Sequence, residues 1–570
     1  MTLKIFIGFF TIWLFADSAV KFARCEIAKN TGVQSCLMDK KDQGSLVVEM
    51  IFPGNLSLYP VARRTTSLLH SNWPVGIVYP KTEQDIREAL ACATEYETKV
   101  AARCGGHGNA GQAVLTGGLT LDLREMNAVS FVNDSMDLVR VQAGATAGSA
   151  VYWTYRLSNG TRSLPVGQKP SVGIAGLTLG GGFGFSTRHT GLLCDRLQSV
   201  RMILADGTAV NASKEENSDL FWSSCGGGGG NYGIVTEFVF RPSNVDSDYT
   251  EFVYLMPLVK EYATPVVDYY QDWSMVMDNR ATANLEIGSV LESDVDEHFV
   301  EGIAYWLSEF AEGVFNGTEE FLQDVPTSIA KQWRDEGQMK FLMIVGFFRG
   351  NETEFNKALR ASGLTNSTPI QIQGFYTNQG TILDAVLDLS GWDTPNAESL
   401  LDRFEQEHTY YKYKSMFLEE KLSADVVDIL IDHAYFNSSE SVVFEFQSLG
   451  GSTSAFAAVS PTDTAFAHRN ARHCLMFKSN GKSLESGTNA MGRMWSLWNE
   501  ILPSIKGGAA YVNHMDTDIT QYEKAYYGLS GYGLSDANAQ FVTINRLAGI
   551  SAEYDPAGRF SSAQPCCTRV

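Results

Sequence analysis

The sequence predicts an α+β fold. Strand-like and helix-like patterns alternate over the first half of the 570-residue chain, and further strand-like runs occur in its middle, at 341–348 and 442–446. Several glycine-rich blocks lie among these patterns, and such blocks are typical of backbone that packs closely against a large flat group. A chain of this length can form two or more domains, each with its own core.

The first half can be followed element by element. A strand is expected at 76–79, and Thr82 followed three residues later by Asp85 is typical of a helix start. The helix would present one apolar face, made by Ile86, Ala89, Leu90 and Ala93. Further strands are predicted at 99–102, 119–123 and 138–142. The alternating run at 200–210 around Asp206-Gly207 predicts a hairpin.

Composition excludes one class of partner. The formal net charge is −21, and no stripe of lysine and arginine interrupts the acidic surface. Such a surface repels phosphate backbones, so we expect no nucleic-acid partner. The ligand should be small, and neutral or locally paired.

The N-terminus has the pattern of a secretory signal peptide over residues 1–18. Lys4 supplies positive charge, residues 5–16 are mostly apolar, and Ala16-Asp17-Ser18 provides small residues for cleavage. An anchor helix needs about twenty apolar residues, but Asp17 and Lys21 interrupt the run too early. We therefore expect a secreted protein with no membrane segment after signal removal.

Export agrees with the glycosylation and cysteine patterns. N-x-S/T sequons begin at Asn55, Asn133, Asn159, Asn211, Asn316, Asn351, Asn366 and Asn437, as in a glycoprotein. The nine cysteines include no C-x-x-C pair, so we expect no metal site. We expect a few disulfides and at least one free thiol, with connectivity left open by the spacing.

Four blocks carry the chemistry. They are R-C-G-G-H at 103–107, the glycine-rich run at 165–184, the run at 219–236 with five consecutive glycines, and Y-V-N-H at 511–514. A Gly-Gly turn lets backbone N–H groups approach a pyrophosphate or a ring edge, and His107 would project into that gap. Each block alone is also compatible with an ordinary surface turn.

The four blocks, in this order and spacing, resemble the berberine bridge enzyme family of flavoproteins. That resemblance implies a two-part FAD-binding domain of the vanillyl-alcohol-oxidase (PCMH) type and an antiparallel-sheet substrate domain with helices. The implied division is a signal peptide at 1–18, an N-terminal lead-in at 19–72, the FAD-binding domain at 73–245, the substrate domain at 246–480 and a segment returning to the FAD-binding domain at 481–570.

The resemblance also implies the cofactor and its contacts. His107 matches the histidine that bonds covalently to the 8α-methyl carbon of FAD, and an imidazole there makes the ring a better hydride acceptor. Simple turn formation is the alternative for the glycines, and some matched positions would be spacers. The positions matched to cofactor contacts are Arg103, Cys104, Gly105, Gly106, His107, Gly108, Asn109, Ser171, Gly173, Gly176, Gly181, Gly182, Gly233, Ile234, Val235, Tyr511 and Asn513.

Departures from the family pattern are informative. Doubly tethered members carry a cysteine where this chain has Lys169, so a single bond through His107 is expected. The family's glutamate position holds Leu475 and its tyrosine position holds His514, which argues against a carboxylate base. Cys36 and Cys92 match a disulfide of plant relatives.

His514 is then the candidate catalytic base. The usual histidine pKa of about 6.5 lies near working conditions. If the Y-x-N-H segment is extended, Tyr511 and Asn513 lie on one face and His514 on the other. Alternatively, His514 is a packing residue and a tyrosine of the middle domain removes the proton. Gln447 matches a substrate-facing position and is expected to donate a hydrogen bond.

The resulting hypothesis is a secreted, monomeric FAD-linked oxidase. It would oxidise an alcohol, a hemiacetal or a C–H or C–N group of a small organic substrate and pass the electrons to dioxygen. Ile174 occupies a position where the family restricts dioxygen with a bulky residue, so a dehydrogenase with another acceptor is the alternative. The third hypothesis is a flavin-binding glycoprotein without redox turnover.

Overall fold

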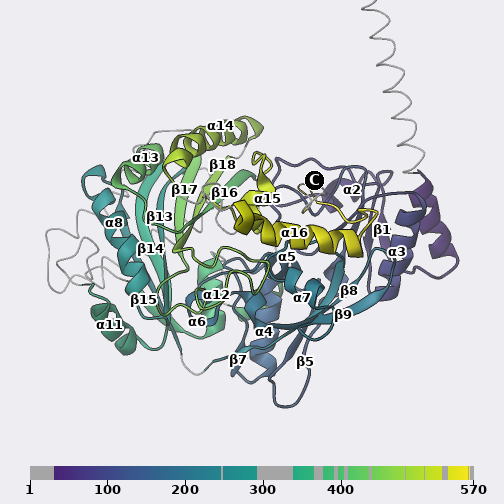
Figure 1. Cartoon of the computed structure of the whole chain (residues 1–570), viewed down its shortest axis with the longest axis horizontal. Helices are drawn as coiled ribbons and strands as arrows, with labels where there is room; N and C mark the ends of the chain where they lie inside the picture. The colour runs from purple at the N-terminus through teal and green to yellow at the C-terminus, as the bar shows by residue number, and fades with distance from the viewer. Residues whose placement is uncertain are drawn as a thin grey trace, which may run out of the picture.

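The computed structural model describes residues 31–562 together with Gln564 and Cys566, except for 246–247, 292–337, 365–375, 391–395, 404–408, 436–439, 482, 506–507 and 529–536. The chain forms two halves that lie side by side (Figure 1). The signal-peptide prediction and the sequons at Asn316, Asn366 and Asn437 lie outside the described residues.

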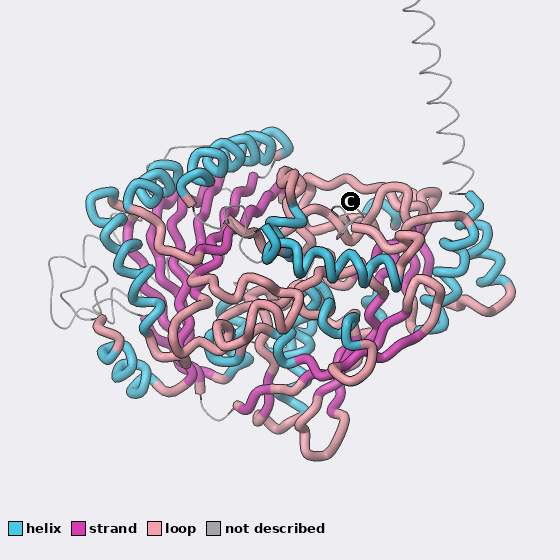
Figure 2. The backbone as a smooth tube through the Cα atoms, viewed as in Figure 1, coloured by secondary structure: helices cyan, strands magenta, loops and turns pink. Residues whose placement is uncertain are grey.

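Besides a two-stranded sheet of β7 (Arg162–Ser163) and β11 (Ser243–Asn244), the first half contains two larger sheets, drawn in magenta at the right and below in Figure 2. The smaller has the strand order β1-β2-β4-β3, and the larger, antiparallel one has the order β5-β6-β10-β8-β9. In the smaller sheet the bounds are β1 (Glu49–Ile51), β2 (Gly76–Tyr79), β4 (Leu119–Asp122) and β3 (Val100–Arg103). In the larger they are β5 (Val129–Phe131), β6 (Val139–Gln142), β10 (Ile234–Phe240), β8 (Leu197–Ile203) and β9 (Ala209–Ser213).

The predicted elements of this half are confirmed. Thr82 and Asp85 form a reciprocal capping box at the start of α3 (Glu83–Glu95), and Ile86, Ala89, Leu90 and Ala93 are buried in the core. β8 pairs with β9 around the predicted turn. Further helices are α2 (Tyr59–Ala62), α4 (Ala147–Leu157), α5 (Ile174–Leu179), α6 (Thr187–Thr190) and α7 (Ser218–Ser223).

The second half is a seven-stranded antiparallel sheet in the order β15-β12-β14-β13-β17-β18-β16. Its bounds are β15 (Tyr376–Gly380), β12 (Tyr249–Pro257), β14 (Gln338–Arg349), β13 (Ala281–Leu291), β17 (Ser441–Ser448), β18 (His473–Gly481) and β16 (Tyr410–Leu418). The strand-like runs at 341–348 and 442–446 are thus confirmed as parts of β14 and β17.

The two faces of this sheet differ because side chains alternate along a strand. Leu285, Phe446, Leu475 and Phe477 form a buried core with helices on the outer face. These helices are α8 (Lys260–Val276), α13 (Ala424–Tyr435) and α14 (Leu484–Ile501), at the left and upper edge of Figure 1. The opposite face of the sheet is turned toward the first half.

Two segments cross between the halves. α12 (Ile382–Ser390) and the turn at Ala397–Leu401 contribute side chains to the core of the first half. After α14 the chain returns to the first half, where α15 (Tyr522–Tyr527) and α16 (Ala537–Tyr554) contribute Tyr526, Tyr527 and Leu547 to that core. α14 itself packs on the sheet of the second half, so the return begins after it.

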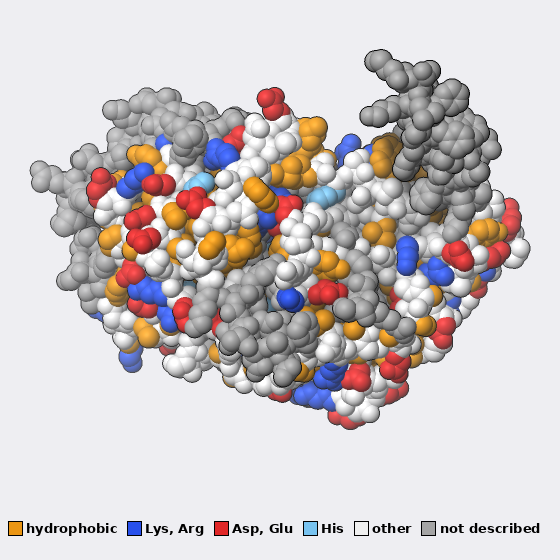
Figure 3. All heavy atoms as spheres, turned by 45° about the horizontal axis from the view of Figure 1, so that its top comes forward, with side chains coloured by type: hydrophobic (Ala, Val, Ile, Leu, Met, Phe, Trp, Pro, Cys, Tyr) orange, Lys and Arg blue, Asp and Glu red, His pale blue; other side chains and the backbone are white. Residues whose placement is uncertain are grey.

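Two disulfides and a mixed surface complete the description. Cys36 bonds to Cys92, as expected, and Cys194 bonds to Cys225; Cys104 and Cys474 are free thiols. In the face drawn in Figure 3, acidic and basic side chains are interspersed. Among the helices of the described part, none is long and apolar enough to cross a membrane.

Candidate active site

A cavity of about 640 Å³ lies between the two halves. That volume is within the range of cofactor and ligand sites. One wall comes from loops of the first half, including 103–109, 167–169 and 228–231. The other wall comes from the polar face of the seven-stranded sheet, including Glu286, Tyr413, Gln447 and Lys478.

The first wall is made by interlocking glycines. A Cβ added at Gly105 would lie 2.3 Å from the Gly173 nitrogen, and one at Gly173 would lie 2.4 Å from the Gly105 nitrogen. Neither position can therefore carry a side chain without moving backbone. Gly176 and Gly230 line the cavity with no atom within 4 Å of an added Cβ, so backbone there faces open space.

His107 stands at the end of this wall. Its Nε2 lies 2.9 Å from the Ser171 hydroxyl oxygen, which leaves Nδ1 as the second ring nitrogen. Burial, together with the charge of Lys169, lowers the pKa of His107 to about 4. The ring is therefore neutral at ordinary pH and can act as a nucleophile.

Lys169, at the place where doubly tethered relatives carry cysteine, also lines the cavity. Desolvation within the cavity and the nearby Lys478 lower the pKa of Lys169 to about 8.

Most of the predicted cofactor residues line the cavity, and four do not. Ser171 contacts His107 from behind, Gly181 packs against Phe466, and the Gly182 N–H donates to the Tyr511 hydroxyl at 3.0 Å. Ile234 is buried in the core of the first half because its side chain points to the other face of β10. The remaining predicted residues lining the cavity are Arg103, Cys104, Gly105, Gly106, His107, Gly108, Asn109, Gly173, Gly176, Gly233, Val235, Tyr511 and Asn513.

The side chain of Arg103 has a structural role. Its Nε donates to Asp122 at 2.6 Å and its NH1 donates to the Ala62 carbonyl at 2.7 Å, so the guanidinium holds the end of β3 in place. The Arg103 and Arg124 guanidinium groups also lower the pKa of Asp122, although burial opposes them.

The Y-x-N-H segment is a 3-10 turn, Val512–His514, and the expectation of an extended strand is wrong. The His514 N–H donates to the Tyr511 carbonyl at 2.9 Å and closes the turn, and the Asn513 amide donates to the Tyr511 hydroxyl at 2.9 Å and to the Leu177 carbonyl at 3.2 Å. Tyr511, Asn513 and His514 therefore all line the cavity, and they are not divided between two faces.

His514 lies beside aromatic rings and is partly buried. Its ring centroid is 5.0 Å from that of Tyr511 and 6.4 Å from that of Tyr413. Burial and Lys478 lower the pKa of His514 to about 4, below the usual value on which the sequence argument relied. Its Nδ1 is buried and has no hydrogen-bond partner within the described chain.

The sheet wall contains charged residues that the sequence analysis missed. Glu445 accepts hydrogen bonds from the Gln168, Asn284 and Gln447 amides and pairs with Lys478, while Glu286 lies on the neighbouring strand. Lys478 lowers the pKa of Glu445, although burial opposes it, whereas burial raises the pKa of Glu286 to about 7. The sequence signal that could have identified these residues is a charged residue at alternate positions of an otherwise apolar strand-like run.

Gln447 uses one N–H of its amide within the protein. Its Nε2 donates to Glu445 at 2.8 Å, and its Oε1 is a buried acceptor without a partner in the described part of the chain. The family glutamate position, Leu475, lies in the outer core, so it could not supply a group to the cavity. The acidic residues of the site come from other strands.

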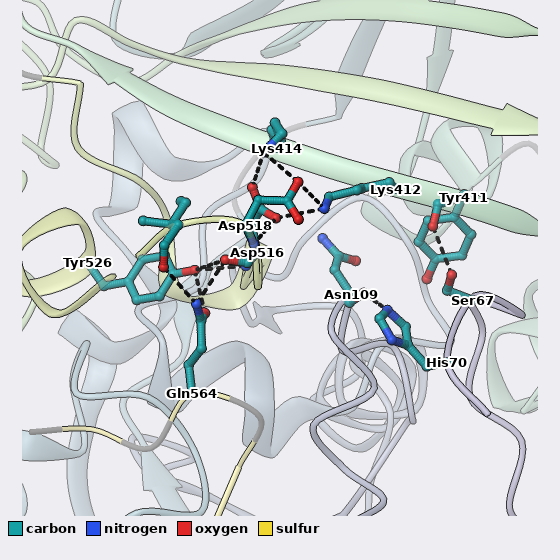
Figure 4. A network of polar contacts seen from close by, with 11 residues as sticks. Ser67, His70, Asn109, Tyr411, Lys412, Lys414, Asp516, Asp518, Tyr526 and Gln564 are labelled. Atoms are coloured by element: carbon teal, nitrogen blue, oxygen red, sulfur yellow. Dashed lines mark hydrogen bonds and ion pairs between the residues drawn. The ribbon is translucent and has the colours of Figure 1, made fainter. Parts of the chain in front are cut away.

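A second polar network fixes the C-terminal segment beside the cavity (Figure 4). Lys412 and Lys414 of β16 pair with Asp516 and Asp518, which follow the Y-x-N-H turn. The His70 ring contacts the Asn109 carbonyl at 2.7 Å. The Asn109 amide nitrogen is buried, unpartnered among the described residues, and lines the cavity.

One cluster has the residue types of a metal site. Cys194, Asp195 and Cys225 place potential ligand atoms within 4.8 Å of one another. The two sulfur atoms are joined in a disulfide, so they offer no thiolate to a metal.

Comparison with known proteins agrees with this geometry. Residues 74–213 match a family model described as an FAD binding domain. Glucooligosaccharide oxidase of Sarocladium strictum is 27% identical over 508 residues, which covers 86% of each chain. Berberine bridge enzyme-like D-2 of Nicotiana tabacum is 24% identical over 462 residues, covering 78% of this chain and 72% of that protein.

The chain carries an FAD binding domain, and its relatives over most of its length are berberine bridge enzyme-like proteins and glucooligosaccharide oxidase. Among solved structures, BBE-like 1 of Physcomitrella patens superposes with a TM-score of 0.75 at 22% identity, covering 94% of this chain and 99% of that one. The structure of glucooligosaccharide oxidase from Acremonium strictum superposes with a TM-score of 0.74 at 22% identity, covering 94% and 100%. Its title describes a 6-S-cysteinyl, 8α-N1-histidyl FAD.

The residues of this FAD-linked oxidoreductase fit the cofactor. The glycines leave the backbone of this wall open to contact with a flat ring such as that of a flavin. The Asn109 amide nitrogen, which has no hydrogen-bond partner among the described residues, lines the same cavity. FAD-dependent oxidoreductase activity, with the oxidase type favoured by the oxidase relatives, follows from the family.

Proposed function

We propose that the protein is a secreted oxidase that converts a sugar hemiacetal to a lactone. The single observation that carries this proposal is the cavity between a glycine wall with His107 and a sheet face rich in hydrogen-bonding side chains. A polyhydroxylated substrate fits such a face, because each hydroxyl needs a polar partner when water is excluded. The relationship to glucooligosaccharide oxidase supports the substrate class.

The cofactor would be held by a single covalent bond through His107. Ser171 contacts Nε2, so Nδ1 is the nitrogen left to bond the flavin methyl group, and the neutral ring supplies the lone pair. The two-electron chemistry of FAD would take the hydride from the anomeric carbon and pass the electrons to dioxygen, giving hydrogen peroxide.

His514 would accept the hydroxyl proton as the C–H bond breaks. Its Nδ1 has no partner, and its lowered pKa keeps the ring neutral over the ordinary pH range. Tyr413, whose pKa burial raises, is the tyrosine of the middle domain nearest to this ring and the alternative base. A phenol with a raised pKa keeps its proton at ordinary pH and offers no phenolate, whereas the neutral His514 ring has a free lone pair, which supports His514 as the acceptor.

Secretion and a monomeric state complete the proposal. The signal-peptide pattern and the Cys36–Cys92 and Cys194–Cys225 disulfides support an oxidising destination. Ile174 lies at the first position of α5 and is fully buried. If its side chain keeps dioxygen from the flavin, the protein would be a dehydrogenase with another acceptor.

The test is anaerobic bleaching of the flavin. The purified yellow protein is mixed with sugars, aryl alcohols and polyketide alcohols, and absorbance is followed before air is admitted. We expect sugars to bleach the flavin and air to restore its colour with release of peroxide. Bleaching by sugars with slow return in air would indicate the dehydrogenase, and no bleaching by any sugar would reject the proposed substrate class.

A further inference from the structure

We infer that Glu445 is a positioning residue that fixes the Gln447 amide with its oxygen toward the cavity, so that the site recognises a substrate hydroxyl through its proton. This inference rests on the proposed function and specifies how that site selects its substrate. It concerns a hydroxyl that donates a hydrogen bond, and it excludes ether oxygens and fluorine at the same position.

Glu445 lies in the middle of β17 with a fully buried side chain. Its Oε1 accepts from Gln168 Nε2 at 2.8 Å, from Asn284 Nδ2 at 2.9 Å and from Gln447 Nε2 at 2.8 Å. Its Oε2 pairs with the Lys478 ammonium. One carboxylate therefore gathers donors from the loop at 168, from its own strand and from the two strands beside it.

The ionised carboxylate can only accept hydrogen bonds. The Lys478 charge holds the pKa of Glu445 below its usual range, so Glu445 has no proton to donate. Each of the three amides must therefore turn its NH2 group toward Glu445. For Gln447 this leaves Oε1 at the opposite end of the amide, and rotation would replace a hydrogen bond by a contact between two acceptors.

The Gln447 side-chain oxygen is an acceptor that lacks a hydrogen-bond donor within the described residues. It is buried, and Gln447 lines the cavity. A buried acceptor left without a donor is costly, and native structures rarely keep one unless a ligand or water completes it. The group that completes it must donate a proton, and a sugar hydroxyl beside the reacting carbon has that chemistry.

The experiment uses a sugar that bleaches the flavin, together with its monodeoxy, deoxyfluoro and O-methyl analogues at each hydroxyl. Rapid mixing under anaerobic conditions gives the apparent dissociation constant and the limiting rate of flavin reduction. At one hydroxyl we expect all three analogues to bind about 10- to 100-fold more weakly, because none of them can donate there. Fluoro and O-methyl analogues that bind like the parent sugar at every position would overturn the inference.

Two variants assign the effect to these residues. Gln447→Met leaves the Glu445–Lys478 pair intact, and we expect it to reduce the analogue penalty to within about threefold. Glu445→Gln lets the Gln447 amide turn, so the penalty for fluoro and O-methyl analogues should shrink while the limiting rate changes less than the affinity. Glu440→Gln, at a buried glutamate that pairs with Arg493 outside the cavity lining, is the matched control and should keep the penalty.

The outcomes separate this inference from the proposed function. If no sugar bleaches the flavin, both fail. If a sugar bleaches it and Gln447→Met keeps the full analogue penalty, only the inference fails. A shifted flavin absorbance in Gln447→Met with unchanged analogue binding would show that the amide contacts the cofactor, which also overturns the inference. If Glu445→Gln does not fold, Gln447→Met decides the question.

Discussion

At the scale of single residues, the role of His107 can be tested most directly. Acid-precipitated wild-type protein should keep its yellow colour, whereas His107→Ala should release all flavin into the supernatant, because the covalent bond requires the imidazole. Lys169 stands where a thioether would need a cysteine, so no second covalent bond would retain the cofactor. Absorbance of the two fractions after precipitation measures this. Free FAD in the wild-type supernatant would contradict the tether.

Loss of His514 should slow flavin reduction by about two to four orders of magnitude, the usual effect of removing a general base. The covalent flavin and its spectrum should remain. Stopped-flow reduction of His514→Gln and His514→Ala, with an identified substrate, measures the effect. Rates within about threefold of wild type in both variants would assign the proton transfer to another group, with Tyr413→Phe the next variant to examine.

The pH dependence of that reduction follows from the same residue. A base must be unprotonated to accept a proton, and the pKa of His514 is lowered to about 4. The limiting rate should therefore be flat from about pH 5.5 upward to neutrality and fall as the pH drops through about 4. A fall centred near pH 6.5 would show that the ring titrates as an exposed histidine, contrary to its burial.

At the scale of elements, the contact between the loop at 103–109 and the start of α5 depends on two glycines. Gly173→Ala places a Cβ 2.4 Å from both the Gly105 nitrogen and the Cys104 sulfur, so backbone must move. We expect a loss of about 1–3 kcal/mol in the free energy of unfolding, with weakened flavin attachment. Gly492→Ala, in α14 with no atom within 4 Å of the new Cβ, is the control and should be neutral or stabilising.

The disulfide between Cys36 and Cys92 ties the helix at 31–42 to α3. The bond closes a separation of 56 residues, so its loss enlarges the conformational entropy of the unfolded chain. The Cys36→Ser/Cys92→Ser double variant should lose about 2–4 kcal/mol of unfolding free energy. Denaturant titration measures this. The same midpoint in wild type and variant without reductant would contradict a structural role.

At the scale of the whole molecule, the C-terminal segment joins the two halves through buried charges. Lys414 and Asp516 are each 1% exposed, so Asp516→Asn leaves Lys414 with only Asp518, 3.2 Å away. Removing one partner of such a pair costs about 3–5 kcal/mol. Denaturation followed by both tryptophan fluorescence and the fluorescence of the bound flavin tests this. The exposed Lys260–Asp432 pair is the control, and Asp432→Asn should leave stability unchanged.

Several properties could be predicted from the sequence alone, because they depend on local patterns. The capping box at Thr82, the hairpin around Asp206-Gly207 and the strands of β14 and β17 are set by neighbouring residues. FAD was implied by the resemblance of the glycine-rich blocks to those of the berberine bridge enzyme family. The Cys36–Cys92 pairing came from the family resemblance and not from spacing.

Other properties were decided only by tertiary structure, because they depend on residues distant in the chain. Glu445 meets Gln168, Asn284 and Lys478 only when the loop and three strands are brought together, and that meeting fixes which end of Gln447 faces the cavity. The Asn513 amide donates to the Leu177 carbonyl, and its segment is a turn although the pattern also allows a strand. Burial then sets the pKa of His514, and burial is a property of the folded molecule, which no local pattern contains.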